Sequence, residues 1–154
     1  LLRMLRYTQG WTTIVTAVGV LWTARAESVF FVAGALVTST IAKILKMIIR
    51  DPRPDKSAVT RTFGLPSTHS STVTFLCSYV VLGVAHRVAL GEKGGLSALT
   101  PLEMASTLFL VVFPPLVMWS RVALGVHTTR QVVAGGLLGL TCAVGWWTLW
   151  RGTV

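Results

Sequence analysis

Long apolar stretches, separated by short charged segments, are the feature that most constrains how this chain folds. A helix needs about 20 apolar residues to cross the hydrocarbon core of a bilayer, and five stretches reach or approach that length. They comprise residues 7–24, 28–49, 70–86, 102–120 and 131–150. Because backbone hydrogen bonds must be satisfied internally in lipid, such stretches are expected to be helices. The sequence therefore predicts an all-α, polytopic membrane helical bundle of about five transmembrane helices.

Composition agrees with this placement in the bilayer. Apolar residues make up 53% of the chain and charged residues only 12%, whereas soluble domains average about 25% charged residues. Most tryptophans fall toward the ends of the stretches, where indole rings favour the headgroup region. The connections are too short for a second domain, so we expect one membrane domain over residues 1–154. Since the chain opens on Leu1 rather than Met, we also expect native residues before it.

The formal net charge of +9 is consistent with basic loops, contact with anionic lipid or a phosphate site. Nucleic acid is not an expected partner, because the cations form no stripe and are not interleaved with aromatic residues. With five spans, the loops after the second and fourth spans share one side of the membrane. The segment before the first span lies on the same side, and together with these two loops it carries most of the Lys and Arg. The polar residues of the two loops are therefore expected to meet at one membrane face.

The first of three notable segments covers residues 46–54. Lys43, Lys46 and Arg50 share one helical face, and snorkelling of Lys43 and Arg50 to the interface accounts for those two. Lys46 stands just before a rigid Asp-Pro-Arg-Pro turn. Prolines restrict the backbone around Arg53, and a pre-set guanidinium suits bidentate binding of phosphate oxygens.

The second segment, residues 64–72, has the composition of a loop that turns into a helix start. Hydroxyl side chains there are expected caps, which accounts for Ser70, Ser71 and Thr72. A helix start also offers unpaired N–H groups to anions, so Ser67 and Thr68 are candidate phosphate donors. His69 is placed for proton transfer near neutral pH, although a lone histidine is more often structural.

The third segment joins Arg121, at the end of the fourth stretch, to His127, at the start of the fifth. Thr128 and Gln131 have the spacing of a capping box. Gln131 is also positioned to accept the Nδ1 proton of His127, which leaves Nε2 free to attack phosphorus. The two interpretations of Gln131 are compatible.

Together the segments resemble the signature of the type 2 phosphatidic acid phosphatase superfamily, which includes vanadium haloperoxidases. Its pattern is Lys-x6-Arg-Pro, then Pro-Ser-x-His, then Ser-Arg-x5-His-x3-Asp, and spacing and order agree from Lys46 to Gln131. The resemblance implies a phosphate cradle, a general acid and base, and a nucleophile. These roles fall to Lys46, Arg53, Arg121, Ser67 and Thr68 for the cradle, His69 for proton transfer, and His127 for attack.

Two positions depart from the family pattern. Thr68 stands where the family has Gly, and Gln131 stands where it has Asp. A neutral amide stabilises the developing imidazolium of His127 less than a carboxylate does, because charge-assisted hydrogen bonds are roughly twice as strong. Gln at position 131 and a hydroxyl residue directly after Ser67 also resemble the motif of the dolichyl diphosphatase branch of the superfamily.

The resemblance implies an integral-membrane lipid phosphatase that works through a phosphohistidine, without metal or cofactor. The first expected substrate is a polyprenyl or dolichyl diphosphate, and the bilayer is the other partner. A phosphatase for phosphatidate or sphingoid-base phosphate is the enzymatic alternative. Two further alternatives are a vanadate-dependent haloperoxidase and a catalytically silent phospholipid-binding protein. The dolichyl resemblance implies the endoplasmic reticulum with a lumenal site, whereas counting positive charges places the site in the cytosol.

Overall fold

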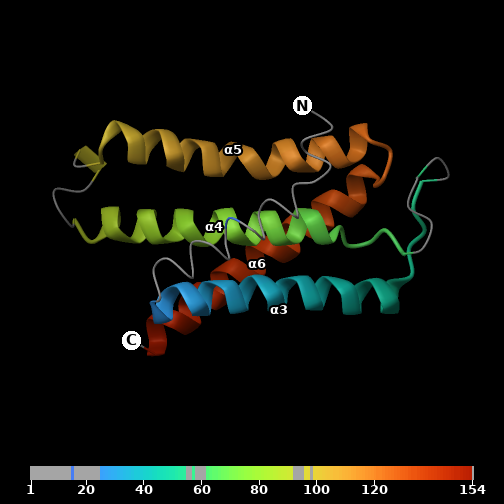
Figure 1. Ribbon diagram of the computed structural model, residues 1–154, viewed down its shortest axis with the longest axis horizontal. Helices are drawn as coiled ribbons and strands as arrows, with labels where there is room; N and C mark the ends of the chain where they lie inside the picture. Colours follow the sequence, from blue (N-terminus) through green and yellow to red (C-terminus); the bar gives the residue numbers. More distant parts are fainter. Residues whose placement is uncertain are drawn as a thin grey trace.

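Four long helices form the part of the chain that the computed structural model describes, which is residues 15, 25–54, 57, 62–91, 96–97 and 99–153. They are α3 (Ala26–Ile49), α4 (Thr68–Ala89), α5 (Pro101–Ala123) and α6 (Thr129–Thr153) (Figure 1). Each is long and apolar enough to cross a membrane. They match the second to fifth stretches expected from the sequence, to within about one helical turn at each end. The first expected span, residues 7–24, lies outside the described residues apart from Val15, so the count of five stays a prediction.

The four helices alternate in direction, and α4 packs against each of the other three. In Figure 1, α3, α4 and α5 run side by side, while α6 crosses behind α4. The most extensive interface joins α4 to α6. Because of this alternation, the end of α3, the start of α4, the end of α5 and the start of α6 lie at the same end of the bundle (Figure 1).

Local sequence explains where these helices end and begin. After α3, Arg50 adopts a left-handed conformation (φ 53°) and donates its N–H to the Lys46 carbonyl at 3.1 Å. The following Asp-Pro pair cannot continue the helix. Ser67 caps α4 by accepting from the Ser70 N–H at 3.4 Å. These caps fix both edges of the loop that carries Arg53.

Two glycines let α6 approach the start of α4 very closely. A Cβ added to Gly135 would lie 2.5 Å from the Ser67 carbonyl oxygen, and one added to Gly139 would lie 2.2 Å from that of Ser71. Four-residue spacing of small residues is a common means of close helix contact in membranes. The approach also brings the residue that caps α4 to the first turn of α6, where the Ser67 N–H donates to the Gln131 carbonyl at 3.0 Å.

Apolar side chains cover much of the outer surface of the bundle. Leu102 is 79% exposed, Ile48 70% and Leu36 65%, while the buried core consists of two small clusters, one around Phe75 and one around Val117. Exposing so large an apolar surface to water is unfavourable in free energy, whereas lipid chains solvate it. The exposed surface is therefore that of an integral membrane protein.

Candidate active site

The three sequence segments come together at one end of the bundle. The loop after α3 is tied to the segment before α4, because the Gly64 N–H donates to the Asp51 carbonyl at 2.8 Å. That segment is in turn tied to α6 through Ser67 and Gln131, at 3.0 Å. The loop from α5 to α6 closes the group, since Arg53 reaches the Val126 carbonyl at 2.8 Å.

Arg53 is held by its neighbours in one orientation. Its Nε donates to the Thr62 carbonyl at 2.8 Å and its Nη2 to the Thr62 hydroxyl at 3.0 Å. Its Nη1 donates to the Val126 carbonyl and lies 3.2 Å from Nε2 of His127. Since these contacts fix the guanidinium plane, the cation is fixed directly beside the ring nitrogen that faces the site.

Three cations converge on the two histidines of the motif. The charges of Lys46, Arg53 and Arg121 act on both His69 and His127, and those of Arg53 and Arg121 act on Lys46. Arg121 is only 6% exposed. Like charges held this close in a partly buried site repel one another, and a bound anion relieves that repulsion. The end of the bundle is therefore suited to a multiply charged anion such as phosphate.

His127 is kept neutral by this environment. Its side chain is buried, and burial, followed by the charges of Arg53 and Lys46, lowers its pKa from 6.5 to about 3. The hydrogen bond that His127 donates to the Gln131 amide oxygen raises the pKa, and the charge of Arg121 adds to the lowering. A neutral imidazole keeps a lone pair, which a nucleophile requires.

The Gln131 amide determines which ring nitrogen carries that lone pair. Its Oε1 lies 3.2 Å from the Thr128 N–H and 3.1 Å from Nδ1 of His127. Its Nε2 donates to the Asp51 carboxylate at 2.6 Å and to the Pro52 carbonyl at 2.7 Å. A backbone N–H only donates and a carbonyl only accepts, so these partners exclude the flipped amide. His127 therefore carries its proton on Nδ1, and its lone pair is on Nε2, facing Arg53.

The capping interpretation of Gln131 also holds in the structure. Its backbone N–H donates to the Thr128 hydroxyl at 3.3 Å, while its side chain accepts from the Thr128 N–H. These two reciprocal bonds are those of a capping box. Gln131 thus helps to cap the start of α6 and also contacts His127.

Ser67 and Thr68 are both buried at the start of α4. Ser67 accepts from the Ser70 N–H and from the Ser70 hydroxyl, at 3.0 Å for the latter. These bonds account for Ser67 as a helix cap, and its contact with phosphate remains a prediction. His69 is half-buried one residue further along, within the field of the three cations.

Three residues of this site were not singled out from sequence. Thr62 orients Arg53, Asp51 bonds to Gln131, and Gly64 leaves room for the Gln131 amide, since an added Cβ would lie 2.2 Å from its Nε2. The Asp-Pro-Arg-Pro turn indicated a restricted backbone around Arg53, next to Asp51, but no spacing rule pairs residues about 80 positions apart.

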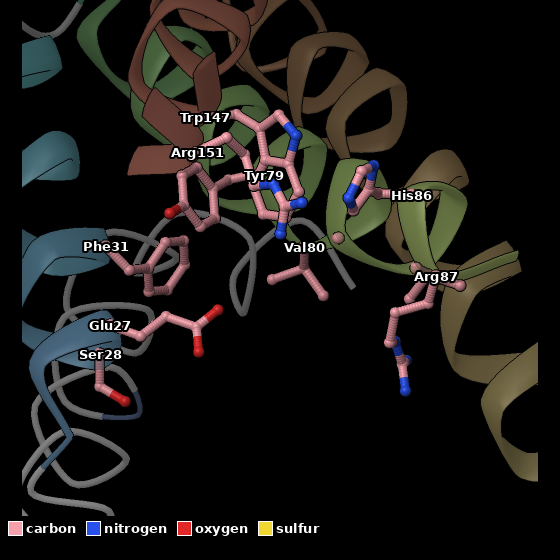
Figure 2. Close-up of a pocket in the computed structure, with 11 residues that line it drawn as sticks. Glu27, Ser28, Phe31, Tyr79, Val80, His86, Arg87, Trp147 and Arg151 are labelled. Carbon is pink, nitrogen blue, oxygen red and sulfur yellow. The ribbon is translucent and has the colours of Figure 1, made fainter. Parts of the chain in front are cut away.

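A cavity lies at the end of the bundle opposite the three motif segments. It has a volume of about 400 Å³ and is lined by residues of α3, α4 and α6, among them Glu27, Tyr79, His86 and Trp147 (Figure 2). No residue of the three motif segments lines it. His86 is thus separated from the cation cluster by most of the length of α4.

Comparison with known proteins agrees with this geometry, as the family model of the PAP2 superfamily matches residues 27–153. The chain belongs to the PAP2 superfamily. Dolichyldiphosphatase 1 of Homo sapiens is 31% identical, over 78% of this chain and 51% of its own length. Lipid phosphate phosphatase epsilon 1, chloroplastic, of Arabidopsis thaliana is 28% identical, over 78% of this chain and 39% of its own length. The chain thus spans about half, or less, of these relatives.

A solved structure shares the fold. The crystal structure of a transmembrane PAP2 type phosphatidylglycerolphosphate phosphatase from Bacillus subtilis superposes with a TM-score of 0.71, covering 96% of this chain and 70% of that one. The identity is 20%, so this match concerns the fold alone. The family resemblance predicted from the three motifs is confirmed, and the chain is a membrane-spanning member of the PAP2 superfamily.

Proposed function

We propose that this protein hydrolyses a lipid phosphate or diphosphate ester through a phosphohistidine formed on Nε2 of His127. The observation that carries the proposal is the position of His127: Nδ1 faces the Gln131 amide oxygen at 3.1 Å, and Nε2 faces Arg53 at 3.2 Å. A fixed lone pair beside a phosphate-binding cation is the arrangement that in-line attack needs.

In the first step, phosphate oxygens accept hydrogen bonds from the N–H groups of Arg53, Lys46 and Arg121, whose positive charges stabilise the anion. The Nε2 lone pair of His127 then forms the N–P bond while the P–O bond to the lipid breaks. His69 supplies the proton that the leaving oxygen requires. The products of this step are the free lipid alcohol, or lipid monophosphate, and the phosphoenzyme.

In the second step, water attacks the phosphorus of the phosphohistidine. His69, now deprotonated, takes a proton from that water as the new P–O bond forms. The P–N bond breaks, its electron pair returns to Nε2, and inorganic phosphate leaves. The proton count is thereby restored, and His69 is ready for another turnover.

An apolar groove supports a lipid as the leaving group. It has a volume of about 420 Å³, lies between α4, α5 and α6, and is lined mainly by apolar side chains that include Met118 and Leu137. Met118 precedes Arg121 by about one helical turn, and Gly136, also in the lining, follows Gln131 by five residues. A hydrocarbon chain in this groove would place its phosphate at the cation cluster.

A polyprenyl diphosphate of the dolichyl type is the first substrate to test. This choice is supported by the similarity to dolichyldiphosphatase 1 and by Gln131, which stands where the family pattern has Asp. Phosphatidate and sphingoid-base phosphate are the alternatives. The endoplasmic reticulum, with a lumenal site, remains the corresponding prediction for location. Similarity to a chloroplastic enzyme means that the relatives do not single out that membrane.

No metal is assigned to the reaction, because Lys46, Arg53 and Arg121 supply the positive charge that phosphoryl transfer needs. Among the described residues, no group of three or more His, Cys, Asp or Glu side chains is placed to hold a metal ion. We therefore expect turnover to be unchanged by EDTA.

The proposal is tested by phosphate release from a panel of lipids, including polyprenyl diphosphate and phosphatidate, presented in detergent micelles. His127→Ala should abolish release, because no other group replaces the lone pair of Nε2. His86→Ala is the matched control, since this histidine lies at the opposite end of α4 and should leave the rate unchanged. Undiminished release by His127→Ala would overturn the mechanism. Lipid binding without release by the wild-type protein would favour a silent binding protein, and vanadate-dependent halide oxidation would favour a haloperoxidase.

A further inference from the structure

We infer that Asp51 is a positioning residue for the nucleophile, acting through the Gln131 amide as the last member of a His127–Gln131–Asp51 chain. This inference rests on the proposed function of His127. In the family pattern a carboxylate occupies the position of Gln131 and is adjacent to the histidine. In this chain the carboxylate is that of Asp51, which lies in the loop after α3 and accepts from the nitrogen of the Gln131 amide.

The hydrogen bonds of the Gln131 side chain form a continuous and fully occupied path. The amide has two lone pairs and two N–H donors, and all four are used, at 3.1 and 3.2 Å on the oxygen and 2.6 and 2.7 Å on the nitrogen. Gln131 itself is fully buried. The shortest of these bonds is the one to the Asp51 carboxylate, which points to a charge-assisted bond.

The negative charge of Asp51 acts on His127 by polarising this chain of hydrogen bonds, and no proton is transferred along it. When Nε2 of His127 bonds to phosphorus, positive charge develops on the ring and on Nδ1–H. Hydrogen bonds in a chain polarise one another, so a negative Asp51 makes the Gln131 oxygen a stronger acceptor for that proton. The amide then stabilises the imidazolium more than an isolated amide would.

The two oxygens of Asp51 have separate partners. Oδ2 accepts from Gln131, while Oδ1 forms an ion pair with Arg130. The Arg130 side chain is 72% exposed and that of Asp51 is 16% exposed, so the pair lies at the edge of the site. Exposed ion pairs contribute little free energy, and Arg130 serves mainly to orient the carboxylate.

The test replaces Asp51 by Asn, which keeps an oxygen for Gln131 and removes the charge. Single-turnover formation of the phosphoenzyme on the best lipid of the panel should slow by about tenfold, the loss expected when a charge-assisted bond becomes neutral. KM should change by less than about twofold, because the phosphate-binding cations are untouched. Glu27→Gln, at the opposite end of the bundle, is the matched control for a lost carboxylate and should keep the wild-type rate. An unchanged rate in Asp51→Asn, or a loss confined to KM, would overturn the inference.

A second variant separates positioning from a general structural effect. Gln131→Asp puts a carboxylate directly beside His127, and that carboxylate then faces Asp51. In this background Asp51→Asn removes repulsion, so it should leave the rate unchanged or increase it. An equal slowing in both backgrounds would mean that Asp51 acts independently of Gln131, and would overturn the chain.

A spectroscopic measurement keeps the inference independent of turnover. The chain has three histidines, so ¹⁵N-labelled imidazole signals are few enough to assign in detergent. The His127 Nδ1–H proton should resonate upfield of its wild-type position in Asp51→Asn, since its acceptor is weakened, and should not move in Glu27→Gln. An unmoved resonance would contradict the inference. If no lipid is hydrolysed but this proton still moves, the proposed function fails and the positioning contact stands.

Discussion

At the scale of single residues, the environment of His127 predicts an unusual response to pH. Burial and the neighbouring cations lower its pKa from 6.5 to about 3, so the ring stays neutral through the whole range from pH 8 to 5. An ordinary histidine would be almost fully protonated at pH 5. Titration of the His127 ring by ¹⁵N NMR in detergent should show no protonation above about pH 4, and a midpoint near 6.5 would contradict this electrostatic account.

The same shift predicts how stability depends on pH. The unfolded chain binds a proton at His127 below about pH 6.5, whereas the folded site excludes it down to about pH 3. The free energy of unfolding therefore falls as the pH drops through this window. Replacing His127 by Gln removes the titrating group, so the decline between pH 6.5 and 4 should be shallower in thermal unfolding. A variant as acid-sensitive as the wild type would assign the decline to other groups.

The candidate site was largely predictable at this scale, and the missing part has a physical reason. The spacings within residues 46–54, 64–72 and 120–131 grouped the cations, both histidines and Gln131 into one candidate site, and the structure brings these residues together, while their catalytic roles stay predictions. Asp51 and Thr62 were not identified, because their function arises from contacts between loops. The Asp51–Gln131 contact joins residues 80 positions apart. Local spacing says nothing about which carboxylate a folded loop brings to a buried amide.

At the scale of helices, the contact of α4 with α6 depends on Gly139. Even the Cβ of alanine would lie 2.2 Å from the Ser71 carbonyl oxygen, so the helices would have to separate. Gly139→Ala should cost about 1–3 kcal/mol of stability, the usual effect of overpacking. Gly145→Ala, on the same helix with nothing within 4 Å of the added Cβ, is the control, and it should be neutral or stabilising because alanine favours helix. Thermal unfolding in detergent distinguishes them, and equal melting temperatures would contradict the close contact.

At the scale of the whole molecule, hydropathy predicted the membrane location and about five spans, four of which are the helices that the structure describes, because lipid requires long, continuous apolar segments. The order in which these helices pack was less accessible. Membrane helices lack a hydrophobic force that sorts their faces, and their packing depends on small residues and shape. The central position of α4 and the groove between α4, α5 and α6 therefore came only from the structure.

That groove gives a prediction about chain length in the substrate. Val111 and Val112 are neighbours on α5 and are both 54% exposed, but only Val111 is in the groove lining. Val111→Trp would fill part of the groove, so KM for a long polyprenyl diphosphate should rise by about fivefold or more. Hydrolysis of a short, soluble isoprenyl diphosphate should change little, because only the long chain needs that space. Val112→Trp adds the same bulk outside the groove lining and should leave both substrates unaffected. Equal effects of the two variants on the long substrate would mean that its chain occupies another surface of the bundle.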